Sequence, residues 1–122
     1  MQLSTGQLAE AFSRHQFALV YEYLADAVQW NLIGGDLLEG KATVIRTCEQ
    51  SAEYLTGVVT TFKRFRTVVG QESVVVESEA DYTDAGNART TVASCDIYDF
   101  VDSKLVRITS YTVQLGDSSD IP

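Results

Sequence analysis

Apolar residues recur with a helical period in two stretches near the start of the chain. The first stretch opens with a capping box, Ser4 and Gln7, and continues with an apolar pair four residues apart, Leu8 and Phe12. After a polar break, a second stretch predicts a helix that ends near residues 25–26 and whose apolar face is formed by Phe17, Val20 and Leu24. We therefore predict two short helices before residue 27.

The pattern changes to strict alternation after these helices. Apolar side chains alternate at Val28, Trp30 and Leu32, and the glycine pair at 34–35 then breaks the pattern as a turn would, which predicts a short strand over 27–33. A third and longer helix is predicted over 41–55, with Gly57 as its stop signal. Its apolar face comprises Val44, Ile45, Cys48, Ala52 and Leu55.

The second half of the chain is rich in β-branched and aromatic residues from 58 to 115. Turn signals occur near 70–71, 85–87 and 102–103, so the pattern predicts four long strands. Their connections are too short for parallel crossovers, and the strands should pair as antiparallel hairpins. We expect one domain over 1–115, followed by a flexible tail over 116–122.

Helices that precede a strand meander must cover one face of the sheet. The other face should then be polar or paired with a second copy of the chain. Ala93, Cys95 and Ile97 alternate with more polar residues and leave that outer face partly apolar. We therefore expect a homodimer formed through the open sheet face.

The charge of the chain argues against two classes of partner. A formal net charge of -8 repels phosphate backbones and anionic lipid surfaces, so neither nucleic acid nor a membrane is expected as a partner. The local cations Lys63, Arg64 and Arg66 alternate with aromatic residues and are interpreted as the solvated face of a strand.

The sequence contains no motif for binding a metal or a cofactor. The two cysteines, Cys48 and Cys95, lack metal-ligand spacing, and the one histidine, His15, lies in a polar stretch where we expect it to be exposed. Unpaired cysteines and the lack of a leader or a long apolar run fit a cytoplasmic protein. Glycine-rich phosphate or dinucleotide motifs are also missing. We therefore expect no metal and no cofactor, and cofactor-free chemistry or plain binding remains.

Four segments of the sequence, at 25–35, 39–45, 95–100 and 104–113, are similar to those of a known family. Together with the order of elements, they resemble the SnoaL-like and ketosteroid-isomerase-like branch of the nuclear-transport-factor-2-like superfamily. The resemblance implies a cone-shaped α+β fold with three N-terminal helices packed on one face of a curved, mostly antiparallel sheet. It also implies one small-molecule pocket, but not a reaction, because this fold hosts isomerases, cyclases, dehydratases, epoxide hydrolases and non-catalytic modules.

The resemblance places Asp96 where the isomerases hold a protonated aspartate that stabilises an oxyanion. Strand alternation puts Asp96, Tyr98 and Phe100 on one face, and we expect that face to line the pocket. An apolar pocket would raise the pKa of Asp96 and allow it to donate a proton or a hydrogen bond. The alternative is a hydrogen-bonded or solvent-facing strand residue.

Two more site positions come from the same comparison. Asn31 stands where the isomerases carry their aspartate base, and we expect it to orient a ligand. Tyr23 stands where they carry a supporting tyrosine, although a packed aromatic explains it equally well. The tyrosine that the isomerases carry on their first helix falls on or near Leu8 and is missing here.

Epoxide hydrolases of the superfamily offer a second comparison. They hold a water with an Asn and a Tyr on the first strand, where this chain has Asn31 and Gln29. Their water-activating carboxylates and arginine fall on Ser110 and on or near Glu79 and Asp81, so that set is broken here.

The remaining pocket candidates follow from strand parity and position. Parity on the last strand turns Ile108 and Ser110 inward, and Tyr54 near the end of the third helix either covers the opening or packs. Trp30 is a candidate wall residue. On a regular strand, Trp30 and Asn31 cannot both face the cavity.

Two functions remain open from the sequence. The first is an isomerase, cyclase or hydrolase that acts by acid/base chemistry on a small hydrophobic carbonyl or polyketide-like compound, with Asp96 as the acid. The second is a non-catalytic module of the same fold that binds a ligand or another protein.

Overall fold

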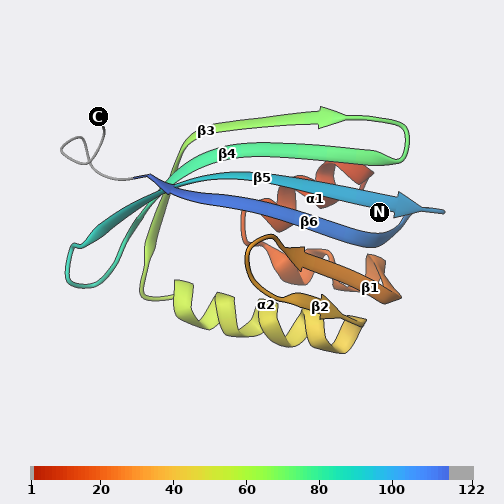
Figure 1. The fold of residues 1–122 in the computed structure, drawn as a ribbon, viewed down its shortest axis with the longest axis horizontal. Coiled ribbons are helices and arrows are strands. Elements are labelled where there is room, and N and C mark those ends of the chain that lie inside the picture. Colours follow the sequence, from red (N-terminus) through yellow and green to blue (C-terminus); the bar gives the residue numbers. More distant parts are fainter. Residues whose placement is uncertain (1, 116–122) are drawn as a thin grey trace.

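The computed structural model describes residues 2–115 as an α+β fold built on one mixed, curved six-stranded sheet. The strand order is β2-β1-β6-β5-β4-β3, and the helices lie on one side of the sheet (Figure 1). The elements in chain order are α1 (Thr5–Ser13), two 3-10 turns (Phe17–Leu19 and Tyr21–Tyr23), β1 (Leu24–Leu32), β2 (Leu37–Glu39), α2 (Lys41–Leu55), β3 (Val59–Val69), β4 (Ser73–Thr83), β5 (Arg89–Val101) and β6 (Lys104–Leu115). The predicted fold class is confirmed, and the expected tail at 116–122 lies outside the described residues.

The first helix begins where the capping box predicts. The Ser4 hydroxyl accepts from the backbone N–H of Gln7 at 3.1 Å, and the Gln7 side chain accepts from the backbone N–H of Ser4 at 2.8 Å. These two bonds satisfy backbone donors that the first helical turn leaves without partners. Leu8 and Phe12 of α1 are buried against the sheet.

The predicted second helix is wrong. Two 3-10 turns replace it, and β1 begins already at Leu24. An apolar spacing of three residues fits a 3-10 turn as well as an α-helix. Phe17 and Val20 are buried as the pattern required, but residues 2–115 contain two α-helices rather than the predicted three.

The first strand pairs with the last one in parallel, an arrangement that we did not predict. Trp30 pairs with Ile108 and Leu32 with Ser110 in the β1–β6 ladder, while β1 pairs antiparallel with β2 on its other edge. The strand β2 is only three residues long, too short for its sequence to predict a strand. Helix α2 matches its predicted bounds, and Gly40 precedes it with a φ of 94° that favours glycine.

The four long strands form the antiparallel meander that the turn signals predicted. Asp102 and Ser103 both have positive φ, as a two-residue hairpin turn between β5 and β6 requires. In β3 the register shifts between Phe62 and Arg64, so Lys63 is an extra residue in the strand. This bulge keeps both Phe62 and Phe65 on the helix side of the sheet, where their rings pack edge to face.

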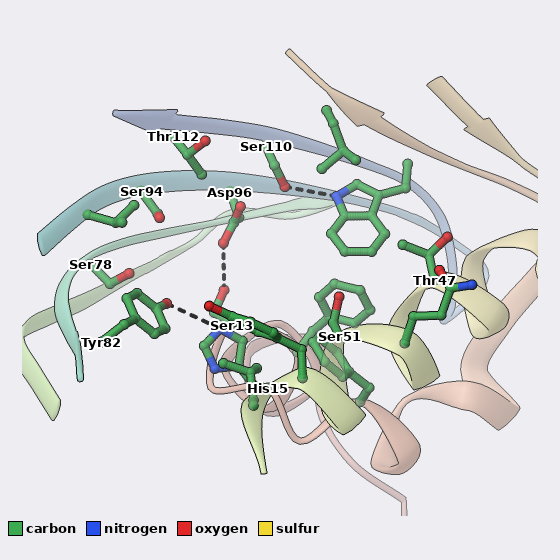
Figure 2. A pocket seen from close by; sticks show the side chains of 18 residues that line it. Ser13, His15, Thr47, Ser51, Ser78, Tyr82, Ser94, Asp96, Ser110 and Thr112 are labelled. Carbon is green, nitrogen blue, oxygen red and sulfur yellow. Dashed lines mark hydrogen bonds between the residues drawn. The ribbon is translucent and has the colours of Figure 1, made fainter. Parts of the chain in front are cut away.

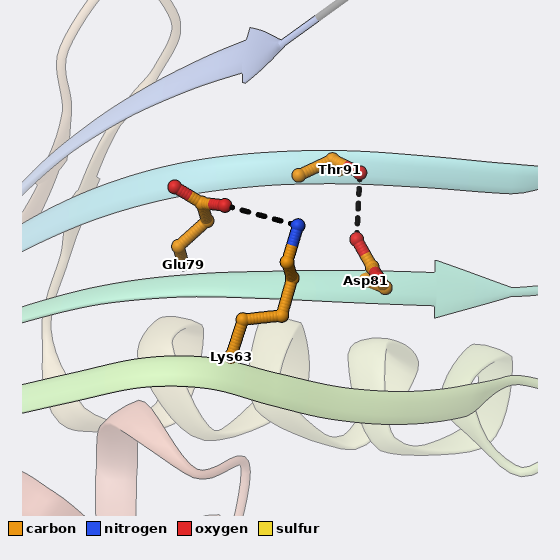
Figure 3. Close-up of polar contacts among 4 residues, drawn as sticks. All are labelled: Lys63, Glu79, Asp81 and Thr91. Atoms are coloured by element: carbon orange, nitrogen blue, oxygen red, sulfur yellow. Dashed lines mark hydrogen bonds and ion pairs between the residues drawn. The ribbon is translucent and has the colours of Figure 1, made fainter. Parts of the chain in front are cut away.

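The basic residues of β3 lie on the outer face, as the sequence indicated. Lys63 pairs with Glu79 at 3.3 Å, and Arg66 pairs with Glu77 at 3.3 Å. Figure 3 shows the Lys63–Glu79 pair beside Asp81, which accepts a hydrogen bond from Thr91 at 2.6 Å. Exposed pairs of this kind contribute little to stability but occupy the cations that an anion would need.

The core lies between the helices and the inward face of the sheet. Its fully buried side chains come from every layer and include Leu8, Val20, Leu24, Val28, Val44, Cys48, Val74, Val76, Tyr98, Leu105 and Ile108. No helix within residues 2–115 has the length and apolar character needed to cross a membrane.

Truncation of a buried leucine should cost more unfolding free energy than truncation of an exposed one. Leu8→Ala is expected to lower the free energy of unfolding by about 2 to 5 kcal/mol, because Leu8 is 1% exposed and its loss leaves a cavity. Leu19→Ala is the matched control, because Leu19 is 53% exposed and its truncation should cost about 0.5 kcal/mol or less. Urea unfolding measures both, and equal losses would contradict this placement of the core.

Candidate functional site

A cavity of about 530 Å³ lies between the inward face of the sheet and the helices. One wall is apolar and largely aromatic, and the sheet side carries a carboxyl group and several hydroxyls (Figure 2). The lining residues are Phe12, Ser13, His15, Phe17, Trp30, Leu32, Thr47, Gln50, Ser51, Tyr54, Leu55, Ser78, Tyr82, Val92, Ser94, Asp96, Ser110 and Thr112. A volume of this size suits a small organic molecule.

The aromatic wall is built around one phenylalanine of α1. The ring of Phe12 meets those of Phe17 and Trp30 edge to face, each with centroids 5.0 Å apart. The ring of Tyr98 lies behind it at 5.9 Å. These contacts fix the orientation of the wall, because packed aromatic rings have few alternative rotamers.

Asp96 of β5 points into this cavity and is hydrogen-bonded by α1. The Ser13 hydroxyl donates to Oδ2 of Asp96 at 3.0 Å and lies 2.6 Å from the Tyr98 hydroxyl. A carboxylate can only accept, so the Ser13 proton points to Asp96 and the Ser13 oxygen accepts from Tyr98. The helix and the sheet are therefore joined at the candidate acid.

A second hydroxyl approaches Asp96 from β6. Nε1 of Trp30 donates to the Ser110 oxygen at 2.9 Å, and an indole N–H has no acceptor capacity. The Ser110 proton is thus free to be donated to Asp96, which stands directly opposite it in the β5–β6 ladder. Two serine hydroxyls therefore converge on one carboxyl group.

Burial and hydrogen bonding act on Asp96 in opposite directions. Desolvation raises the pKa of Asp96 above its ordinary value, because a charge in the cavity loses its hydration. Hydrogen bonds from Ser110 and Ser13 favour the carboxylate, the Tyr98 hydroxyl acts in the same direction, and together they offset part of that shift. The net pKa is raised, so Asp96 keeps its proton to a higher pH than an exposed aspartate does.

A row of hydroxyls crosses the sheet beside Asp96. Ser78, Ser94 and Thr112 face one another across β4, β5 and β6 in the strand register and line the cavity (Figure 2). Ser78 is only 5% exposed. The row offers hydrogen bonds to oxygen atoms of a ligand.

The cavity lining also includes groups that the sequence pattern did not single out. Tyr82 of β4 and His15, just after α1, lie near each other with 3.4 Å between the Tyr82 hydroxyl and Nε2 of His15. The prediction that His15 is exposed is wrong, because it is half-buried in the cavity wall. Strand parity with Ser78 would have placed Tyr82 inward, whereas no pattern predicts the position of a residue in a helix-ending turn.

Four of the predicted site residues line the cavity. Asp96, Trp30 and Ser110 lie within one hydrogen-bonded group, and Tyr54 lines the cavity with 72% of its surface exposed. The catalytic role expected for Asp96 stays a prediction.

The other predicted site residues lie elsewhere. Trp30 faces the cavity, so strand alternation turns Asn31 and Gln29 to the opposite side of β1, and the placement of both in the pocket is wrong. The Gln29 side chain lies 3.4 Å from Arg107. Tyr23 packs on the core with its hydroxyl accepting from the backbone N–H of Leu3 at 3.1 Å.

Tyr98 and Ile108 point to the predicted side of the sheet but lie too deep. Both are completely buried in the core beneath the cavity and do not line it. Tyr98 still contacts the site through its hydrogen bond to Ser13.

The residues compared with the epoxide hydrolases cannot act together. Glu79 and Asp81 lie on the outer face of the sheet, whereas Ser110 lies on the inner face (Figure 3). The positions that correspond to the water-activating residues of the epoxide hydrolases therefore lie on two different faces of the sheet. Within residues 2–115, no group of three or more histidine, cysteine or acidic side chains is placed to hold a metal ion.

Several solved structures have a similar fold. A nuclear-transport-factor-2-like protein of unknown function from Cytophaga hutchinsonii is 33% identical, with a TM-score of 0.77 over 87% of this chain and 93% of the other. A candidate polyketide cyclase from Xanthomonas campestris pv. campestris is 17% identical, with a TM-score of 0.68 over 85% of this chain and 83% of the other. An LEH-like epoxide hydrolase from M. tuberculosis is 18% identical, with a TM-score of 0.66 over 88% of this chain and 81% of the other.

The last two similarities bear on the fold alone, because identities below 20% do not carry an activity between proteins. No curated protein matches the sequence. The family model described as the SnoaL-like domain matches residues 6–108, which run from α1 through all of β5 to the first residues of β6. The chain therefore belongs to the SnoaL-like domain family.

Proposed function

We propose that the protein binds a small hydrophobic carbonyl or polyketide-like compound and transforms it by cofactor-free acid/base chemistry. The observation that carries the proposal is the Asp96 carboxyl, which faces a largely apolar cavity with a raised pKa and two serine donors. A protonated Asp96 can donate to a carbonyl oxygen and stabilise the charge that develops there. Isomerisation and ring closure are both reactions that such a donor accelerates.

The shape and polarity of the cavity support an oxygen-bearing ligand with one apolar face. Phe12, Phe17 and Trp30 would pack on that face, while the hydroxyl row of Ser78, Ser94 and Thr112 would bind oxygen atoms along the opposite edge. The comparison proteins include a candidate polyketide cyclase, whose name agrees with a substrate of this type.

Binding without reaction is the second candidate function. It is favoured by the position of Asn31, which replaces the base of the isomerases and also lies outside the cavity wall. A protein of this kind would hold its ligand against the same aromatic wall without turnover.

Substitution of Asp96 separates the two functions. A panel of ketones, epoxides and lactones is tested for binding through the fluorescence of Trp30, the single tryptophan of the chain, and for turnover by mass spectrometry. Asp96→Asn is expected to retain binding and to lower turnover by about 10²- to 10⁴-fold, as expected for loss of a general acid.

Asp81→Asn is the matched control, because Asp81 lies on the same sheet but on its outer face, and an Asn oxygen can still accept from Thr91. It should change neither binding nor turnover. Binding of panel compounds without any turnover would favour the second function, and turnover unaffected by Asp96→Asn would contradict the role of the carboxyl.

The same substitution should alter how stability depends on pH. Burial raises the pKa of Asp96 in the folded chain, so the folded state binds this proton more tightly, and the free energy of unfolding falls as the pH rises through the folded pKa. Asp96→Asn removes that fall and should gain stability relative to the unsubstituted protein between about pH 4 and about pH 8. Urea unfolding across this range measures the gain, and a difference that does not change with pH would count against a perturbed Asp96.

We also propose that two copies of the chain pair through the outer face of the sheet. Val68, Tyr111 and Val113 on this face are 54%, 46% and 60% exposed, and Val75 and Ile97 lie between them on β4 and β5. Light scattering should give twice the chain mass of 13.4 kDa, and Tyr111→Glu should shift the protein toward one copy. A single-chain mass for the unsubstituted protein at micromolar concentration would contradict the pairing.

A further inference from the structure

The turn after α1 holds the one histidine of the chain in a left-handed backbone conformation. His15 has a φ of 66° and follows the C-terminal cap residue Arg14. The His15 N–H donates to the Phe12 carbonyl at 3.0 Å, and the Gln16 N–H donates to the Ala11 carbonyl at 2.8 Å. These are the two bonds of a Schellman motif, which usually carries Gly at this position because a Cβ is disfavoured there. A non-glycine residue held in this conformation beside a cavity is a candidate for function.

The backbone turn places the imidazole among aromatic rings at the cavity. The His15 ring lies 5.8 Å from the rings of Phe17 and Tyr82 and 6.0 Å from that of Phe62, measured between centroids. The position of Phe62 depends on the bulge at Lys63, so two local irregularities of the backbone build this environment. Burial lowers the pKa of His15, which keeps the imidazole neutral and therefore able to accept a proton.

His15 and Asp96 belong to the same cavity and are connected by their neighbours. Ser13, two residues before His15, donates to Asp96 at 3.0 Å, and Tyr82 lies 3.4 Å from Nε2 of His15 (Figure 2). Burial raises the pKa of Tyr82, and a charge on Asp96 raises it further. One cavity thus contains a protonatable carboxyl and a neutral imidazole.

We propose that His15 is the proton-accepting partner of Asp96, a role that rests on the proposed acid/base function. His15 removes a proton from the carbon next to a substrate carbonyl, and Asp96 gives its proton to the carbonyl oxygen, so that the ketone becomes an enol. In the reverse direction Asp96 takes back the oxygen-bound proton while His15 returns a proton to carbon, and both side chains recover their starting states. The substrate class is narrowed to compounds with an acidic C–H bond beside a carbonyl group.

Tyr82 is a positioning residue in this arrangement. If Nε2–H of His15 donates to the Tyr82 hydroxyl, the basic lone pair lies on Nδ1, because a neutral imidazole carries one proton. Loss of the hydroxyl should therefore leave the base present but poorly oriented.

The charges around His15 give the expected direction of pH dependence. The titratable and charged groups around His15 are Tyr82 of β4, Asp96 of β5, Tyr54 of α2 and Arg14, the residue before His15 in the chain. The guanidinium of Arg14 lies 3.9 Å above the centroid of the ring of Phe65. Base activity should be lost as the pH falls through the lowered pKa of His15, since the imidazolium cannot accept a proton.

Hydrogen exchange from a ketone tests the base without knowledge of the natural substrate. The probe is 2-tetralone in D2O, with exchange of its α-protons followed by proton NMR and binding followed by quenching of Trp30 fluorescence. The variants are His15→Asn, Tyr82→Phe, Asp96→Asn and the outer-face control Asp81→Asn. Asn tolerates left-handed backbone angles, and His15→Gly provides a second variant that removes the Cβ altogether. Thermal melts verify that each variant is folded.

His15→Asn and His15→Gly are expected to bind the probe as before and to slow exchange by about 100-fold or more, with a smaller loss for Tyr82→Phe and none for Asp81→Asn. Exchange that stays within about threefold in the His15 variants, while Asp96→Asn slows it, would overturn the role of His15 and leave the proposed function standing. Loss of binding in both His15 variants would also overturn it, in favour of a purely structural contact. An unsubstituted protein that binds the probe but exchanges no protons would contradict the proposed function and the role of His15 together.

Discussion

The register of β5 between β4 and β6 determines which side chains reach the cavity and which reach the outer surface. Val76, Asp96 and Ser110 stand opposite one another across the three strands. The hydroxyl row of Ser78, Ser94 and Thr112 is the next set of side chains on the same face of the sheet. Because side chains alternate strictly, a slip of one residue would turn Asp96 outward and bring Cys95 inward. The apolar residues of the same strands prevent that slip, since Val74, Val76 and Tyr98 must remain under the helices.

The buried carboxyl is tolerated because its hydrogen bonds are arranged before any ligand arrives. Trp30 and Tyr98 act as outer donors, which leaves the protons of Ser110 and Ser13 for Asp96. The two serines hold the carboxyl in place, and desolvation still raises its pKa. Fewer donors would make the buried carboxyl costlier to fold, and more donors would lower its pKa. The observed balance suits the proposed role, in which Asp96 both holds and releases a proton.

Much of the fold follows from patterns that the sequence displays. The capping box, the bounds of α2 and the hairpins of the last four strands were all predicted, because each depends on local spacing or turn chemistry. The second helix was not, since an apolar spacing of three residues fits two kinds of turn. The parallel pairing of β1 with β6 joins segments that are distant in sequence, and local patterns carry no information about it.

The candidate site was predictable only where strand parity applied. Asp96 and Ser110 were placed correctly by alternation, and the same rule showed that Trp30 and Asn31 could not both face the cavity. The choice between those two depends on tertiary packing, in which the indole meets Phe12 and bonds to Ser110. His15 was missed because its direction is set by a single backbone angle after α1 rather than by a periodic pattern.

The raised pKa of Asp96 is the property on which the proposed chemistry depends. A carboxyl-directed carbon NMR titration, assigned by comparison with Asp96→Asn, measures this pKa directly in the folded protein. The structure predicts a value clearly above the ordinary value of about 4, because loss of hydration outweighs the serine hydrogen bonds. A value at or below about 4 would contradict the account, since Asp96 would then be an ordinary carboxylate without a proton to donate.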